Sequence, residues 1–279
     1  MASQGDLRAA GAASGVLDLD AVVDLVRGVR NWRTSYAMGL LDIELRYKRS
    51  LLGPFWISAS LVVSILALSY LFGGIFGQSA SDYSDYTIWL GSGLVVWTLI
   101  SALLMEGCNA FVEHGPYLQN VPLPLSVIAL RVAIRNGIIF LHNFVAVAIV
   151  LVLFGARFHP SALLVFPSLA LILAFGFCVA LALGPLCARF RDVPQVVSSG
   201  IQVLFFMTPI IWRPEQAHHR PMLTAANPFY HMIELIREPM RGQFATPLNW
   251  QVSLGTLVVA ALFAVISLSL SRKRVALWL

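Results

Sequence analysis

The stretch LRYKRSLLGPFW, residues 45–56, joins a short basic string to a long apolar run. Arg46, Lys48 and Arg49 stand directly before the apolar run, and the next charged residue along the chain is Asp82. An α-helix needs about 20 predominantly apolar residues to cross a bilayer, and this uncharged run is longer than that. The stretch therefore predicts the entry of the chain into a membrane, with the basic side chains at headgroup level.

The composition extends this prediction to most of the chain. The 279 residues are 58% hydrophobic and 12% charged, and the mean hydropathy is +0.78. Soluble domains carry about 25% charged residues, so this chain has too few charges to cover a surface in water. The net charge of +5 fits the cytoplasmic excess of Lys and Arg in membrane proteins better than it fits nucleic-acid binding.

Segments without Asp, Glu, Lys or Arg predict an all-α polytopic membrane protein with six transmembrane helices. Only helices and closed barrels satisfy the backbone in hydrocarbon, and these segments lack the alternation of barrel strands. The expected domains are a cytoplasmic N-terminal segment (1–34), an amphipathic interfacial helix (35–49), a six-helix transmembrane domain (50–271) and a cytoplasmic tail (272–279). The six helices are expected at about 54–77, 86–112, 127–154, 161–188, 195–212 and 250–271.

The basic residues indicate the orientation of these helices. With the N-terminus inside, fourteen of the 19 Lys and Arg residues lie on the inner side and five on the outer side. The positive-inside rule then places both termini in the cytoplasm. We therefore expect a multi-pass protein of the bacterial cytoplasmic (inner) membrane.

An amphipathic lead-in precedes the first span. Four apolar or aromatic residues recur at helical spacing on one face, namely Tyr36, Leu40, Ile43 and Tyr47. Such a segment lies flat in the interface, with its apolar face down and its cations towards lipid phosphates. Gly53-Pro54 would then bend the chain into the membrane. The alternative is that the basic string only sets the topology.

The connection 213–249 is expected outside and is unusually apolar for a loop. It holds five prolines, yet it also contains the string PFYHMIELI, residues 228–236. Asn227 as N-cap and Pro228 in the first turn predict a short helix to about Arg237. Because breaks flank this helix on both sides, we interpret it as a re-entrant or interfacial element between the fifth and sixth helices. The alternative is a plain extracellular loop.

Four motifs resemble one family in order along the chain. They are RYKRSLLGPFW (46–56), ARFRDVPQVV (188–197), FFMTPIIW (205–212) and NPFYHMIELIRE (227–238). Together they resemble the membrane (permease) subunits of ABC exporters for bacterial surface polysaccharides, the O-antigen, capsule and teichoic-acid export family of type-2 ABC exporters.

The resemblance implies a homodimeric channel, with two copies of a separate ATP-binding cassette subunit docked from the cytoplasm. The implied substrate is a polysaccharide on a lipid anchor that carries a phosphate or pyrophosphate. Residues 40–49 would form an interfacial gate helix, 113–124 would carry a coupling helix, and 227–241 would form an external gate. No GxxxxGK[ST] motif occurs in the sequence, so ATP and Mg²⁺ are expected on the partner and no cofactor on this chain.

Two groups of polar residues are candidate sites. Arg46, Lys48 and Arg49 are expected to attract the phosphate or pyrophosphate of the substrate anchor. Charged and apolar residues of the two inner loops are expected to contact the ATPase, while the alternative for the second loop is a salt-bridged turn. These coupling candidates are Glu113, Tyr117, Leu118, Arg189, Arg191 and Asp192.

Aromatic residues are the candidates for the channel wall. Aromatic faces stack on the C–H surfaces of sugars without fixed hydrogen bonds, which suits a glycan that must slide. The alternative is the interfacial aromatic belt that any membrane protein carries. The candidates are Tyr70, Phe72, Phe76, Trp89, Trp97, Phe205, Phe206, Trp212, Phe229 and Tyr230.

Few ionisable residues lie inside the expected spans. Glu106 is interpreted as a packing or helix-pairing residue, with a substrate contact as the alternative, and His142 with Asn143 as an interhelical hydrogen-bonding pair. Arg131 and Arg135 share one helix face, where they would meet a lipid phosphate or reach to the interface. The three cysteines have no spacing typical of a metal site or disulfide framework, so no metal and no catalytic site are predicted.

Two other functions stay open at this point. One is an ABC exporter of another lipid or of a drug, which would keep the six helices. The other is a membrane enzyme acting on polyprenyl phosphates, which needs clustered Asp, Glu or His at one membrane face. The nearest cluster is Glu215 with His218 and His219, and we interpret it as a solvated loop.

Overall fold

The computed structural model describes residues 19–48, 53, 55–75, 80–120, 123–156, 159–217, 219, 222–272 and 274–279. Within these ranges the chain is helical, with turns and short connections and no strand. The prediction of an all-α fold is therefore confirmed for the described residues. Arg49 and Phe76 lie outside them, and so does the side chain of Tyr117.

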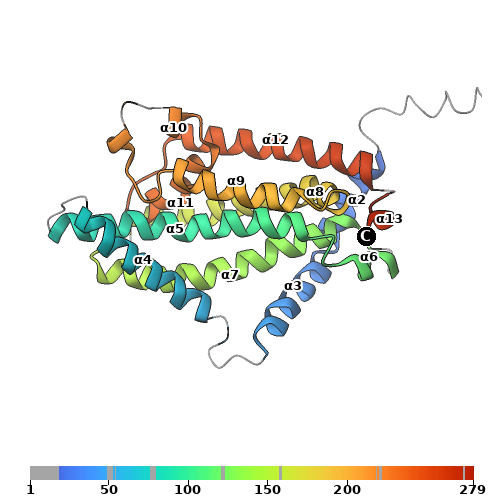
Figure 1. The fold of residues 1–279 in the computed structure, drawn as a ribbon, viewed down its shortest axis with the longest axis horizontal. Helices are drawn as coiled ribbons and strands as arrows, with labels where there is room; N and C mark the ends of the chain where they lie inside the picture. The colour runs from blue at the N-terminus through green and yellow to red at the C-terminus, as the bar shows by residue number, and fades with distance from the viewer. Residues whose placement is uncertain are drawn as a thin grey trace, which may run out of the picture.

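Five helices are long and apolar enough to cross a membrane. They are α4 (Phe55–Ile75), α5 (Ala80–Asn109), α7 (Leu125–Leu153), α8 (Val165–Arg189) and α12 (Pro247–Ser271). In Figure 1, α5, α7, α8 and α12 run along the long axis of the molecule, and α4 crosses them obliquely.

The sixth expected span corresponds to α9 (Val193–Met207), which is apolar but has only 15 residues. It rises roughly 22 Å at about 1.5 Å per residue, which is less than the roughly 30 Å of bilayer hydrocarbon. The helix ends where Thr208 adopts an extended conformation, with φ −91° and ψ 135°. Thr208 precedes Pro209, and the proline ring disfavours the helical conformation for the residue before it. A crossing by α9 stays a prediction.

Shorter helices occupy the two ends of the molecule. Figure 1 shows α2, α6 and α13 at one end, with α3 below them, and α10 and α11 at the other end. Their bounds are α2 (Leu19–Arg30), α3 (Trp32–Tyr47), α6 (Gly115–Asn120), η1 (Pro160–Leu164), η2 (Pro214–Ala217), α10 (Met222–Ala225), α11 (Pro228–Met240) and α13 (Val275–Trp278).

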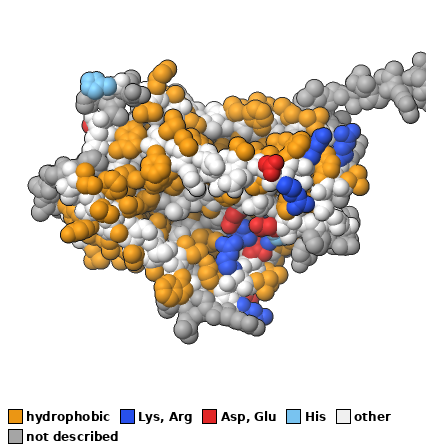
Figure 2. Space-filling view, in the orientation of Figure 1, with side chains coloured by type: hydrophobic (Ala, Val, Ile, Leu, Met, Phe, Trp, Pro, Cys, Tyr) orange, Lys and Arg blue, Asp and Glu red, His pale blue; other side chains and the backbone are white. Residues whose placement is uncertain are grey.

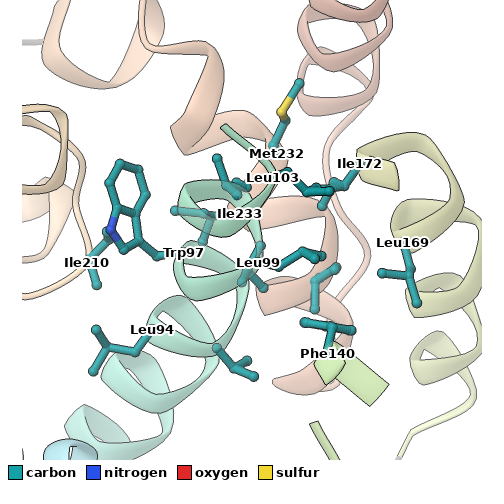
Figure 3. Packing of buried hydrophobic residues seen from close by; sticks show 14 of the residues in the cluster. Leu94, Trp97, Leu99, Leu103, Phe140, Leu169, Ile172, Ile210, Met232 and Ile233 are labelled. Atoms are coloured by element: carbon teal, nitrogen blue, oxygen red, sulfur yellow. The ribbon is translucent and has the colours of Figure 1, made fainter. Parts of the chain in front are cut away.

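The hydrophobic core is built around α5. Figure 3 shows Trp97, Leu99 and Leu103 of α5 surrounded by side chains from α7, α8 and α11, among them Phe140 and Met232. All five of these side chains are buried. Helix α5 is enclosed by its neighbours, and most of its surface is therefore buried inside the protein.

Helix α2 is fastened to the start of α7 by a carboxylate. The backbone N–H groups of Leu125 and Ser126 donate to the two Oδ atoms of Asp24, at 3.3 and 3.1 Å. Asp24 thus caps α7 although it lies about a hundred residues away in sequence, and it satisfies N–H groups that the helix start leaves free. A Cβ on Gly28 would lie 2.1 Å from Ser126 Oγ, so only glycine permits this approach of α2 to α7.

Side chains on the outer surface agree with a lipid environment. Figure 2 shows hydrophobic side chains over most of one face, with Lys, Arg, Asp and Glu gathered mainly towards the end that carries α2, α3 and α13. Large hydrophobic residues are exposed along α4, α9 and α12, for example Val63, Phe206 and Leu262. Apolar patches of this extent are rare on soluble monomers.

Candidate functional site

Two arginine clusters lie at opposite ends of α5. The α3 cluster consists of Asp42, Arg46, Glu106, Arg131 and Arg135. The α11 cluster is built around Trp89 and consists of Asp85, Trp89, Arg213, Glu234, Arg237 and Arg241. From Trp89 to Glu106, α5 rises roughly 25 Å at about 1.5 Å per residue. The sequence therefore concentrates its buried charge at two levels that are a membrane leaflet or more apart.

The α3 cluster joins three helices through carboxylates. Arg131 and Arg135 of α7 both pair with Asp42 of α3, and the Arg135 Nη1–Asp42 Oδ2 distance is 3.1 Å. Arg135 Nη2 also lies 2.6 Å from Glu106 Oε2 on α5, and Asn136 Nδ2 donates to the same oxygen. Both arginines are buried, so their four-residue spacing directs them to protein carboxylates. The interpretation of Glu106 as a helix-pairing residue is confirmed.

Arg46 is the outermost member of this cluster. Its Nη2 lies 3.7 Å from Glu106 Oε1, and 47% of its side chain is exposed. Lys48, one residue after α3, is exposed. The structure thus brings Arg46 to the edge of a buried ion network, shows no salt bridge from Lys48 to another described residue, and does not describe Arg49. Their binding of a lipid phosphate stays a prediction.

Helix α3 packs by its small and polar side. Ser35 and Gly39 are buried against α7, and Ser35 Oγ donates to the carbonyl oxygen of Val127 at 3.0 Å. Tyr36 and Leu40, on the face expected to meet lipid, are exposed. The helix therefore presents an apolar surface outward, as an interfacial helix requires, but its position in a membrane interface stays a prediction.

A small cavity with both polar and apolar walls adjoins the α3 cluster. It has a volume of about 150 Å³, and Arg46, Glu106, Asn136 and Asn143 are among its lining residues. Close to it, Ser58 Oγ donates to Asn143 Oδ1 at 2.7 Å and lies 2.8 Å from His142 Nδ1. The expected interhelical hydrogen bonding by His142 and Asn143 is therefore confirmed, and the partner is Ser58 of α4.

At the other end of α5, Arg237 is fully buried over the ring of Trp89. Its guanidinium carbon lies 3.7 Å from the ring centroid, Nη1 lies 2.5 Å from Glu234 Oε1, and Nη2 donates to the carbonyl oxygen of Pro209 at 3.0 Å. A desolvated cation over an indole face is among the stronger cation–π contacts. One side chain thus joins α11, α5 and the chain that follows α9.

The close fit around Arg237 depends on Gly93. A Cβ at Gly93 would lie 2.1 Å from Arg237 Nη2, so a larger residue would displace the guanidinium. Arg213 and Arg241 also lie over the ring of Trp89, at 6.0 and 5.3 Å from its centroid. They pair with Asp85 at 2.7 and 3.6 Å, and these pairs close the outer edge of the α11 cluster.

The predicted start of α11 is confirmed, and the helix contains a perturbed carboxyl group. Asn227 Oδ1 accepts from the N–H groups of Phe229 and Tyr230 at 3.0 and 3.3 Å, as an N-cap does. Near the other end of the helix, burial first and then a hydrogen bond with Glu234 raise the pKa of Glu238 to about 7. Two adjacent carboxyl groups, Glu234 buried and Glu238 half-buried, favour the neutral form of one of them.

The candidate channel aromatics divide into separate groups. Trp97 contacts Phe205 and Phe229, with ring centroids 5.8 and 6.2 Å apart, and Phe206 lies 5.3 Å from Phe205. Trp212 donates from Nε1 to the carbonyl oxygen of Phe206 at 3.0 Å. These five residues therefore gather where α5, α9 and α11 meet.

The other candidate aromatics lie elsewhere. Trp89 belongs to the α11 cluster, Tyr230 is half-buried beside His231, and Phe72 is half-buried on α4 against the core. Tyr70 is 79% exposed on α4. In the described chain, only Tyr70 and Phe206 among the candidates are exposed, and a role in a channel wall stays a prediction for all of them.

The coupling candidates lie at the end that carries α13. Leu118 of α6 is half-buried in a cluster that also holds Trp278 and Leu279, and Glu113 is exposed. Arg189 lies over the rings of Phe190 and Trp278, at 5.1 and 5.4 Å. Helix α13 contacts both α6 and α8, so it joins the two loops that contain the candidates.

Arg191 and Asp192 complete the coupling candidates in the turn between α8 and α9. Both are exposed, and no salt bridge between them occurs in the described residues. The alternative of a salt-bridged turn therefore finds no ion pair within RFRD itself. Contact with an ATPase stays a prediction.

Sequence reasoning missed the buried ion pairs of both clusters. Glu234 and Arg237 are three residues apart in an otherwise apolar string, which is a signal for an intrahelical ion pair. No local signal links Arg237 to Trp89 or Asp42 to Arg131, because these partners are about 150 and 90 residues apart. The sequence around Gly28 and Gly93 also gave no indication that another side chain packs against each of these glycines.

The sequence model of a family described as "ABC-2 type transporter" matches residues 37–240. This interval begins within α3, ends with α11 and covers more than half of the chain. It contains every member of the two clusters except Arg241.

Three relatives carry names that refer to transport. The O-antigen export system permease protein RfbA of Myxococcus xanthus is 26% identical over 266 residues, which cover 90% of this chain and 97% of the relative. A protein of the same name from Klebsiella pneumoniae is 25% identical over 194 residues, covering 69% and 74%. The daunorubicin resistance ABC transporter permease protein DrrB1 of Streptomyces coeruleorubidus is 27% identical over 213 residues, covering 73% of each chain.

Proposed function

Because this chain belongs to the ABC-2 type transporter family, we propose that it is the channel-forming permease subunit of an exporter for a lipid-linked polysaccharide of the O-antigen or capsule type. The observation that carries this proposal is the alignment with the O-antigen permease of Myxococcus xanthus, which covers 90% of this chain and 97% of the relative. The drug-resistance relative aligns over a smaller part of both chains. The family supports a transport subunit rather than an enzyme.

The proposed topology has six crossings in the bacterial cytoplasmic membrane and both termini in the cytoplasm. Five helices of sufficient length support it, and α9 supplies the remaining crossing. The short length of α9 is compatible with this role because α11 packs beside α5 at the same end of the molecule and Asn227 Nδ2 donates to Thr208 Oγ1 at 2.9 Å. In this proposal α11 is a re-entrant element that fills the outer leaflet where α9 stops.

The proposed assembly is a homodimer with two copies of an ATP-binding subunit. Exposed apolar residues on α4 and α9, such as Tyr70 and Phe206, are the proposed lining of the channel between the two copies. The ATPase would contact the surface formed by α6, the turn at Arg191 and α13. Support for this surface comes from the packing of α13 against both α6 and α8, which holds the two loops as one unit.

For the lipid anchor, we assign Arg46, Lys48 and Arg49 to the phosphate or pyrophosphate. Arg46 supports this role because its contact with Glu106 is long and exposed. An exposed ion pair contributes only about 0–1 kcal/mol, so an incoming phosphate group displaces the carboxylate at little cost. Asp42 and the buried arginines behind it keep α3 in place during the exchange.

ATP hydrolysis by the purified complex tests the proposed function. The complex of this chain with its ATP-binding subunit, reconstituted in liposomes, is expected to hydrolyse ATP faster when a lipid-linked glycan is added. Daunorubicin is the matched challenge for the drug-exporter alternative, and stimulation by the drug instead of the glycan would support that second candidate. Glycan turnover by this chain without any partner would contradict the proposal.

The anchor assignment has its own variant. Replacing Arg46, Lys48 and Arg49 together by Gln is expected to lower export while membrane insertion and ATPase association stay unchanged. Replacing Arg27, Arg30 and Arg33 by Gln removes the same charge from α2 and the start of α3 and serves as the matched control. Normal export by the first variant would eliminate the anchor role and leave the proposed transport activity standing.

A further inference from the structure

A long apolar groove lies between α8 and α12, away from both arginine clusters. Its volume is about 790 Å³, and its lining includes Leu104 of α5, Phe175 and Leu186 of α8, and Thr256 and Phe263 of α12. This volume falls within the roughly 300–1,000 Å³ of ligand sites in proteins. The groove is therefore large enough to hold a small molecule or part of a larger one.

The walls of the groove consist mainly of apolar side chains, and its hydroxyl groups already donate to backbone carbonyl oxygens. Thr256 Oγ1 donates to the carbonyl oxygen of Val252 at 2.8 Å, and Ser267 Oγ donates to that of Ala182 at 2.9 Å. Ser271 Oγ donates to the carbonyl oxygen of Ser267. A polar occupant would find few free partners along the groove, whereas a hydrocarbon chain needs none.

The positive charge of the groove is confined to one end. Arg189 and Arg274 line that end together with Trp278, and both arginines are exposed. Neither forms a salt bridge with a carboxylate in the part of the chain that the structure describes. Arg189 is held in place by the rings of Phe190 and Trp278. Two neighbouring cations, with Arg189 held by aromatic rings, match an anionic headgroup.

The length of the groove matches one leaflet. Between Phe175 and Arg189, α8 rises roughly 21 Å at about 1.5 Å per residue, and one leaflet with its headgroup region is half of a bilayer of about 40–45 Å. An acyl chain fits along this space, and the two cations at one end favour an anionic headgroup as its continuation.

We propose that this groove binds an anionic glycerophospholipid, with one acyl chain along α8 and α12 and the phosphate between Arg189 and Arg274. The lipid would fill a space that the protein leaves open and would neutralise the two cations. This inference goes beyond the proposed function, because it requires only that the chain is embedded in a membrane and does not depend on what is exported.

Native mass spectrometry of the purified protein tests the proposal. The protein is reconstituted with equal amounts of dioleoyl phosphatidylglycerol and dioleoyl phosphatidylcholine, extracted in a mild detergent, and examined for retained lipid. The wild-type protein is expected to retain phosphatidylglycerol in preference. Arg189→Gln and Arg274→Gln are each expected to reduce that occupancy about fivefold, the weight of one basic side chain near an anionic lipid surface.

A pair of adjacent valines offers a matched steric test. Val258 and Val259 are both exposed on α12, but only Val259 lines the groove. Val259→Trp is expected to abolish retention of phosphatidylglycerol, and Val258→Trp is expected to leave it unchanged. Arg33→Gln, at an exposed position on α3 away from the groove, is the charge control and is also expected to retain the lipid.

Three results would overturn the proposal. Equal retention of the two lipids by the wild-type protein would show that the cations do not select a headgroup. Unchanged retention in Val259→Trp and in both Arg189→Gln and Arg274→Gln would place the lipid elsewhere. Displacement of phosphatidylglycerol by an equimolar polyprenyl diphosphate would assign the groove to an export substrate. Since no arm measures transport or ATP hydrolysis, these outcomes are distinct from a failure of the proposed function.

Discussion

The α3 cluster and the α11 cluster use the same chemistry at the two ends of α5, but their innermost ion pairs differ in exposure. In the α11 cluster, the side chains of Arg237 and Glu234 are 0% and 2% exposed, whereas the rim pair of Arg213 and Asp85 is 26% and 47% exposed. In the α3 cluster, exposure rises from 5% at Arg131 to 47% at Arg46. A fully buried pair cannot exchange partners without leaving a charge in a low-dielectric interior. Both clusters have an exposed rim, but at the rim of the α3 cluster Arg46 contacts a carboxylate of the inner network directly, whereas Arg213 and Arg241 pair with Asp85 and leave the Arg237–Glu234 pair separate.

This difference teaches which charges fix the fold and which are available for function. Arg237 contacts the face of Trp89, a carboxylate and a backbone carbonyl at once, so its removal affects three segments. Arg46 contacts one carboxylate at 3.7 Å. We therefore expect substitutions in the α11 cluster to change stability and substitutions at the rim of the α3 cluster to change function.

The largest effect is expected for Arg237→Met. Methionine keeps much of the apolar volume but leaves the Glu234 carboxylate buried without its cation. Breaking a buried pair by removing one partner costs about 3–5 kcal/mol. The measurement is the free energy of unfolding in detergent micelles of increasing SDS fraction. Replacing both Arg237 and Glu234 with apolar residues should recover part of the loss, and a double variant less stable than the single one would contradict this account.

A smaller loss is expected for Asp42→Asn in the α3 cluster. The amide keeps the shape but loses the charge that faces Arg131 and Arg135, and hydrogen bonds to charged groups contribute about 1.5–3 kcal/mol. The control is Arg46→Gln, which breaks only an exposed pair and should cost at most about 1 kcal/mol. Equal destabilisation by both variants in the same unfolding measurement would contradict the distinction between the buried Asp42 ion pairs and the exposed Arg46 ion pair.

The packing of Gly93 predicts a further loss of about 1–2 kcal/mol for Gly93→Ala. The added Cβ would lie 2.1 Å from Arg237 Nη2, and overpacking of a tight site typically costs about 1–3 kcal/mol. Because alanine favours a helix by up to about 1 kcal/mol over glycine, a stabilised variant would show that Arg237 moves away freely. Gly74→Ala is the matched control, since a Cβ at Gly74 of α4 meets no neighbour within 4 Å.

Much of the fold could be predicted from the sequence because long uncharged runs have few alternatives in a bilayer. The five long helices and the Asn227 cap of α11 follow from such local signals. The early end of α9 also had a local signal, since Pro209 disfavours the helical conformation at Thr208. Apolar periodicity selected Tyr36 and Leu40 of α3, which are exposed, and also Ile43 and Tyr47, which are half-buried. It gave no information on the packed face, where Ser35 and Gly39 contact α7.

The two clusters show why the site was harder to predict than the helices. Arg131 and Arg135 were recognised as neighbours because a four-residue spacing places them on one helix face. Their partner Asp42 belongs to another helix, and its contact depends on how α3 packs on α7. Trp89 was selected as a channel aromatic from its residue type alone, whereas the structure surrounds it with three guanidinium groups. Local patterns identify a charged residue, but its partner is a property of the packed structure.

The smallest effect concerns pH and the carboxyl group of Glu238. Its pKa is raised from 4.5 to about 7, first by burial and then by Glu234, so the folded protein holds this proton more tightly than the unfolded chain does. A raised pKa contributes stability that is complete below the ordinary pKa and is lost as pH rises through the folded value. The melting temperature of the wild-type protein should therefore fall between about pH 5 and pH 8.

Glu238→Gln tests whether ionisation of Glu238 causes this loss of thermal stability. The amide cannot ionise, so the variant should lose less thermal stability than the wild-type protein over the same pH range. Glu113→Gln, at an exposed position beyond the opposite end of α5, is expected to follow the wild-type profile. Parallel profiles for all three proteins would show that Glu238 ionises without cost, and the α11 cluster would then be more open to water than its burial indicates. A flatter profile for Glu238→Gln alone would assign a proton, as well as two charges, to the buried face of α11, whereas the α3 cluster balances its arginines with carboxylates alone.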